Sequence, residues 1–132
     1  MSRVTLRILN TVGILLAFGV MLLGASMGRA DTLDDIYREV KPRIAYQRMG
    51  WAADKYAPAE TVTIGNCLTY ARTFKTEAAK AGIYGTIRHC VLWNGGEHAY
   101  FKAADGRVLD NRLMGVVSEE DVGCVRMLSD IN

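Results

Sequence analysis

The sequence predicts one α+β domain, with helices in its first half and an antiparallel sheet in its second. Apolar residues recur at helical spacing in 33–40 and 67–81, and from Tyr84 onward the spacing becomes two residues, with glycine-rich turns between the runs. The chain has 132 residues, half of them hydrophobic and 23% charged, which suits a single small folded domain. No repeat or linker-like stretch marks a second one.

Residues 1–30 have the features of a signal peptide. Two arginines precede an apolar run at 12–23 that is too short for a comfortable membrane span. Gly28-Arg29-Ala30 then places small residues where a signal peptidase cuts, and an uncleaved anchor is the alternative. In either case 31–132 would be exported as one domain. We therefore expect a periplasmic or secreted protein with no stable membrane span once the leader is removed.

The charge of the chain argues against a nucleic-acid partner. The formal net charge is +2, but three of the sixteen basic residues lie in 1–30, which has no acidic residue. The remaining chain has thirteen basic and fourteen acidic residues and is nearly neutral. Such a domain has no general attraction for phosphate backbones, so we expect a protein or peptide substrate.

The first helix is predicted from Leu33 to just before Pro42. Thr32 followed by Asp35 is typical of an N-terminal cap, and proline disfavours helix at the residue before it. The apolar face consists of Leu33, Ile36, Tyr37 and Val40. Residues 44–48 are interpreted as a possible continuation of the helix. Residues 49–66 are interpreted as a long irregular connection, which in a compact domain is more often functional than idle.

The second helix is predicted from Cys67 to Ala81, since this segment has no Gly or Pro and Gly82 is a natural end. Its apolar face consists of Leu68, Ala71, Phe74 and Ala78. The predicted strands are Tyr84–Trp93, His98–Ala103, Arg107–Asp110 and Cys124–Leu128. Two turns, at 94–96 and 104–106, join the first three strands, and Ser118–Asp121 is predicted as a helical turn. The meander would pack on the helix that begins at Cys67.

Cys67 is the candidate nucleophile. It follows Gly65-Asn66 and opens a helix, where free N–H groups and the helix dipole favour a thiolate. The same N–H groups could stabilise an oxyanion. A small buried hydrophobe or half of a disulfide is the alternative interpretation.

His98 is the candidate general base, because it begins a strand at the rim of the sheet. If residues 104–106 form a three-residue turn, Ala103 pairs with Arg107, and Asp110 lies diagonal to His98 on one face. Asp110 could then orient the His98 ring. The alternative interpretations are a turn residue for Asp110 and a solvent-exposed strand residue for His98. His89 lies inside a strand with no acid nearby to orient it, so we interpret it as a sheet-surface residue.

The three cysteines all lie in the exported part of the chain, where disulfides can form. An odd count leaves at least one thiol unpaired. Cys90 and Cys124 are the natural pair, since a bridge would join the first strand of the meander to the last and leave Cys67 free. Three free thiols, or a bridge that involves Cys67, are the alternatives. No CxxC or HxxxH motif occurs, so we expect no metal site.

The order of these residues resembles that of the bacterial transglutaminase-like cysteine proteinases, a branch of the papain-like enzymes. The similar stretch runs from about Leu33 to Val117. It includes Ile44-Ala45-Tyr46, Trp51, Tyr56, Pro58, Glu60, Gly65-x-Cys67, Tyr70-Ala71, His98 and Val108-Leu109-Asp110-Asn111. The resemblance implies a papain-like fold, with Cys67 as nucleophile, His98 as general base and acid, and Asp110 as the orienting carboxylate.

The chain departs from that family around the cysteine. Members usually carry acidic residues there and bind calcium with nearby carboxylates, whereas this chain has Asn66, Leu68 and Thr69. A neutral amide oxygen and a leucine are poor calcium ligands, so we expect no cofactor, calcium included. Thr61 stands where papain-like enzymes have an oxyanion glutamine. The sequence does not choose a replacement among Gln47, Trp51 and Tyr56.

The sequence thus predicts an exported thiol hydrolase that cleaves a peptide or amide bond through Cys67, His98 and Asp110. A transglutaminase-type acyl transferase would use the same three residues. A non-catalytic domain that binds a peptide or protein in the same groove is the alternative from another class. A structural envelope protein held by an uncleaved leader is a third interpretation.

Overall fold

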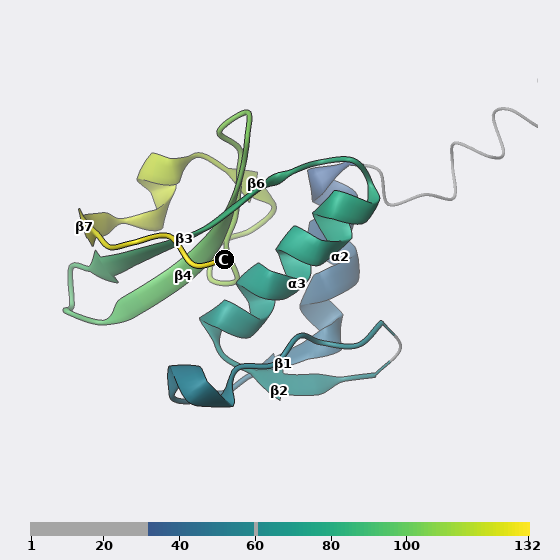
Figure 1. Cartoon of the computed structure of the whole chain (residues 1–132), viewed down its shortest axis with the longest axis horizontal. Helices are drawn as coiled ribbons and strands as arrows, with labels where there is room; N and C mark the ends of the chain where they lie inside the picture. Colours follow the sequence, from purple (N-terminus) through teal and green to yellow (C-terminus); the bar gives the residue numbers. More distant parts are fainter. Residues whose placement is uncertain (1–31, 60) are drawn as a thin grey trace, which may run out of the picture.

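The computed structural model describes residues 32–59 and 61–132. The predicted signal peptide at 1–30 and Glu60 of the family pattern lie outside the described residues. The described chain is a mixed α+β domain, as predicted. Helix α3 (Cys67–Lys80) packs against the sheet on one side and against helix α2 (Leu33–Val40) on the other (Figure 1).

Helix α2 forms where the sequence predicts it. The Thr32 side chain accepts a hydrogen bond from the backbone N–H of Asp35, which caps the first turn. The four residues of the predicted apolar face are all buried against α3 and the sheet. After Val40 the chain tightens into a 3₁₀ turn, Lys41–Arg43, around Pro42.

The segment after Pro42 corrects two predictions. Residues 44–48 do not continue the helix, because Ile44–Tyr46 forms strand β1 and pairs in parallel with β2 (Thr63–Gly65). The connection at 49–66 is therefore not wholly irregular. It contains β2 and a 3₁₀ turn at Trp51–Ala53. The β-branched and aromatic residues at 44–46 suit an extended chain, and β2 accepts and donates the backbone hydrogen bonds that a helix would otherwise supply.

Helix α3 confirms the second predicted helix. It begins at Cys67 and is followed by Gly82, whose φ of 77° is the left-handed conformation that glycine adopts after a helix. Phe74 on its predicted apolar face is fully buried.

The second half of the chain forms a five-stranded antiparallel sheet in the order β6-β5-β4-β3-β7 (Figure 1). The strands are β3 (Gly85–Leu92), β4 (Glu97–Ala103), β5 (Val108–Leu109), β6 (Val116–Val117) and β7 (Cys124–Met127). A capped 3₁₀ turn, η3 (Glu119–Val122), precedes β7. The sequence predicts these elements apart from β6, which has only two residues.

The two faces of β4 pack against different parts of the molecule. Phe101 and Ala99 contact the core formed with the helices, whereas Tyr100 contacts Cys90 and Val122 on the other face. This alternation places His98, two residues before Tyr100, on the face away from most of the helical core. None of the helices in the described part of the chain has the length and hydropathy that a membrane crossing requires.

Candidate active site

Cys67 is the first residue of α3, and the cap before it is fully formed. The Asn66 side chain accepts a hydrogen bond from the Thr69 N–H at 3.1 Å, and the Asn66 N–H donates to the Thr69 hydroxyl at 3.1 Å. The cap leaves the N–H groups of Cys67 and Leu68 without a partner among the described residues. Cys67 thus lies where the helix presents unpaired donors.

Gly65 allows the chain to turn closely into this helix. A Cβ atom at Gly65 would lie 2.5 Å from the Cβ of Thr69, a distance that real side chains do not tolerate. The Gly65 carbonyl also accepts a hydrogen bond from the Gln47 N–H at 2.8 Å. The start of α3 is therefore held against the β1–β2 pair.

His98 and Asp110 meet as the strand register predicts. The Ala103 N–H donates to the Arg107 carbonyl at 2.8 Å, and Phe101 pairs with Leu109. His98 Nε2 then lies 2.8 Å from Asp110 Oδ2, and both side chains are almost completely buried. Since a carboxylate accepts, Nε2 carries the proton and Nδ1 is left to accept one.

Opposing effects set the pKa values of this pair. Burial lowers the pKa of His98, but the hydrogen bonds with Asp110 and Cys67 and their charges outweigh it, so the pKa is raised. Burial raises the pKa of Asp110, but hydrogen bonds from His98 and Arg112 outweigh it, and the pKa is lowered. Both shifts favour an imidazolium beside a carboxylate.

The Cys67 thiol completes the group. It is free and buried, and it is close enough to His98 to act on the pKa of that ring as a hydrogen-bond partner. Cys67 and His98 line one cavity of about 930 Å³. Met49 and Trp51 form part of its wall from the segment after β1, and the 94–96 turn forms another part. The structure thus brings together all three residues that the sequence singles out.

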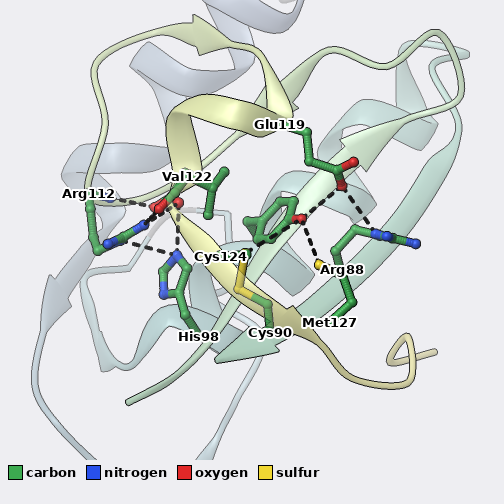
Figure 2. Close-up of a disulfide and its surroundings, with 10 residues drawn as sticks. Arg88, Cys90, His98, Arg112, Glu119, Val122, Cys124 and Met127 are labelled. Carbon is green, nitrogen blue, oxygen red and sulfur yellow. Dashed lines mark hydrogen bonds and ion pairs between the residues drawn. A yellow bond between two sulfur atoms is a disulfide. The ribbon is translucent and has the colours of Figure 1, made fainter. Parts of the chain in front are cut away.

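A disulfide joins Cys90 on β3 to Cys124 on β7, and Cys67 is left unbridged, as predicted (Figure 2). Cys90 is directly opposite His98 in the β3–β4 register. The bridge therefore ties edge strand β7, which follows η3, to β3 at the position opposite the histidine.

Arg112 is a site residue that the sequence analysis misses. Its backbone N–H donates to Asp110 Oδ1 at 2.8 Å, and its Nη2 lies 3.2 Å from Asp110 Oδ2 and 2.7 Å from the Val122 carbonyl. Its Nε lies 3.3 Å from His98 Nε2. A dashed line in Figure 2 marks this contact. Because that histidine nitrogen donates to Asp110, we interpret this contact as close packing of two N–H groups. No sequence motif marks this arginine.

His89 corrects a prediction. The sequence indicates no acid near it, but Glu97 Oε2 lies 3.7 Å from its Nε2. The same carboxylate accepts a hydrogen bond from Trp51 Nε1 at 2.9 Å, and the Trp51 ring packs edge-on against His89 at 5.0 Å between centroids. Glu97 is on the neighbouring strand, eight residues away, so the missed signal is the hairpin that brings it back.

The three candidates for an oxyanion donor have different surroundings. Trp51 lines the cavity, but its N–H donates to Glu97. The Tyr56 hydroxyl donates to Glu77, and neither Tyr56 nor Gln47 lines the cavity. The N–H groups at the start of α3 are the donors closest in sequence to the Cys67 sulfur.

Within the described residues, no group of three or more His, Cys, Asp or Glu side chains is placed to hold a metal ion. No family model matches the chain, and neither does any curated protein.

Proposed function

We propose that the protein is an exported thiol hydrolase, a cysteine peptidase or amidase with the papain-like, transglutaminase-like arrangement that its sequence resembles. The observation that carries the proposal is an unbridged cysteine at a helix start, next to a buried histidine that a buried aspartate holds by a 2.8 Å hydrogen bond. A nucleophile, a base and an orienting group in this relation are what acyl transfer requires.

In the proposed reaction, His98 Nδ1 takes the thiol proton and Cys67 Sγ attacks the carbonyl carbon. The N–H groups at the start of α3 stabilise the oxyanion that forms. His98 then gives its proton to the leaving nitrogen, the C–N bond breaks, and an amine and a thioester result. Water, deprotonated by His98, attacks the thioester and releases a carboxylic acid and the thiol.

An acyl transferase would follow the same path with an amine in place of water. A non-catalytic binding domain is the alternative that a specific observation favours, since Asn66 and Leu68 replace the acidic residues usual beside the cysteine in the family that the chain resembles. The cavity would then hold a peptide segment of a partner.

The test is the rate at which iodoacetamide alkylates Cys67 near neutral pH. A hydrolase should be modified at Cys67 alone, faster than glutathione, and His98→Ala should slow the reaction about 10²-fold or more. His89→Ala is the matched control, because His89 does not line the cavity, and it should keep the wild-type rate. Alkylation of Cys67 no faster than that of glutathione would favour the binding domain. An equal loss of alkylation rate in His98→Ala and His89→Ala would favour it too.

The proposed location is periplasmic or extracellular. The Cys90–Cys124 disulfide is compatible with an oxidising compartment, and 1–30 has the pattern of a leader. N-terminal sequencing of the exported protein should start at residue 31. A start at residue 1 would favour an uncleaved anchor.

A further inference from the structure

We infer that Arg112 selects substrates that carry a carboxylate on the leaving-group side of the scissile bond. This inference rests on the proposed function, since it assigns the chemistry of the leaving group to one wall of the same cavity. The carboxylate is either the α-carboxylate of a peptide C-terminus or an acidic side chain close to the cleaved bond.

Two of the three nitrogens of the Arg112 guanidinium are held by neighbouring groups, and the third is open to the cavity. Nη2 is used by Asp110 and by the Val122 carbonyl, and Nε packs against His98. Nη1 has no partner among the described residues, and the side chain is 36% exposed and lines the cavity. A guanidinium has five N–H donors, so the two on Nη1 are available to a ligand.

A guanidinium fixed in this way is suited to a carboxylate. Each free N–H group of Nη1 can donate a charge-assisted hydrogen bond to a carboxylate oxygen, and because the guanidinium is already held, little side-chain freedom is lost on binding. The Asp110 carboxylate that faces Arg112 is buried and also contacts His98, and it does not line the cavity, whereas Arg112 does. The charge that this part of the wall presents to the cavity is therefore that of the Arg112 guanidinium.

The position of Arg112 assigns the carboxylate to the leaving group. In acyl transfer the histidine delivers its proton to the leaving nitrogen, so the leaving group lies on the His98 side of the cysteine. Arg112 is in contact with His98 at 3.3 Å and so lies on that side. The acyl portion of the substrate would lie elsewhere, against the walls formed by Trp51 and the 94–96 turn.

A second arginine in the cavity provides a matched control. Arg48 is exposed, lines the same cavity, and forms no ion pair with a described residue. It has no contact with His98 or Asp110, so its loss removes the same charge from the cavity without changing the catalytic group.

The experiment measures peptide binding to Cys67→Ala protein, which cannot turn the peptide over, by NMR titration of backbone amides. The probes are acetyl-tetraalanine amide, the same peptide as the free acid, and the amide with glutamate as its last residue. We expect a carboxylate peptide to bind about fivefold more tightly than the neutral one, the size of a partly exposed ion pair. The carboxylate peptide that binds more tightly than the neutral one, whether the free acid or the glutamate amide, identifies the source of the carboxylate.

Arg112→Gln should bring that affinity ratio close to one, Arg112→Lys should keep part of it, and Arg48→Gln should keep all of it. A merely structural role for Arg112 would weaken all three peptides alike and leave the ratio unchanged. A ratio of one in the parent protein, or a loss with Arg48→Gln instead, would overturn the inference. Alkylation of Cys67 in the wild type reports separately on the proposed function.

Discussion

His98 and Asp110 are twelve residues apart in the chain, yet Nε2 of one lies 2.8 Å from Oδ2 of the other. The tight turn between β4 and β5 sets this distance, because it fixes which residues of the two strands are opposite each other. A shift by one residue would put the two side chains on opposite faces of the sheet. The geometry of the candidate site therefore depends on a turn that is itself outside the cavity.

Replacing Asp110 by asparagine should lower the pKa of His98. In the wild type, the bonds with Asp110 and Cys67 outweigh burial and raise this pKa. The amide removes the negative charge and leaves the burial, which favours the neutral ring. His98 should then lose its proton at lower pH than in the wild type, as measured by NMR titration of the ring carbons.

The control for that change is Asp105→Asn, in the exposed turn between β4 and β5. Its carboxylate pairs with Arg107 and does not touch the histidine, so the His98 titration should be unchanged. An unaltered or higher midpoint in Asp110→Asn would show that the carboxylate does not stabilise the imidazolium.

Removing the disulfide should cost about 4 kcal/mol of unfolding free energy, the loop-entropy effect of a bridge between residues 34 apart. The double variant Cys90→Ser with Cys124→Ser is compared with wild type by urea denaturation. Cys67→Ser breaks no covalent link and should cost less than half as much. Peptide mapping without reductant should recover Cys90 linked to Cys124, and a bridge to Cys67 would contradict the assignment.

Gly65→Ala should slow alkylation of Cys67 and destabilise the protein by about 1–3 kcal/mol, the usual range for overpacking. The added methyl would overlap the Thr69 side chain, and relief of that overlap requires the start of α3 to move. Gly50→Ala is the control, because its Cβ would have nothing within 4 Å. The contrary result would be an equal effect of the two substitutions on the alkylation rate.

Calcium should change the melting temperature little. The residues that flank Cys67 offer one neutral side-chain oxygen at Asn66 and none at Leu68, and the Asn66 oxygen is used by the helix cap. Melting curves with calcium and with a chelator test this expectation. A large rise in melting temperature with calcium, and none with magnesium, would show that the protein has a calcium site that these residues do not suggest.

The elements that the sequence predicts well are those with local signals. Helix α2 has a cap, an apolar period and a proline within ten residues, and the structure follows all three. The position of Asp110 next to His98 follows from a short turn, because antiparallel register depends on turn length. The Cys90–Cys124 pairing follows from the expected first and last strands of the sheet.

The parts that the sequence misses depend on distant partners. Strands β1 and β2 have three residues each and are parallel, so neither shows a period long enough to separate it from a loop. Arg112 is held by a carbonyl in η3, ten residues further along the chain. Glu97 reaches His89 from a neighbouring strand. These contacts exist only after the sheet has folded.

The short β1–β2 pair has a consequence for how this domain could diversify. Because the strands are parallel, the segment between them starts beside the end of β2, where the Gln47 N–H donates to the Gly65 carbonyl, and it ends at Thr63, which pairs with Ile44 at the start of β1. Both ends of the segment are therefore held by the same strand pair. Insertions or exchanges within this segment can alter one wall of the cavity while the cysteine keeps its place. Grafting segments of other lengths between Gln47 and Thr63 is thus a practical route to altered selectivity on an unchanged scaffold.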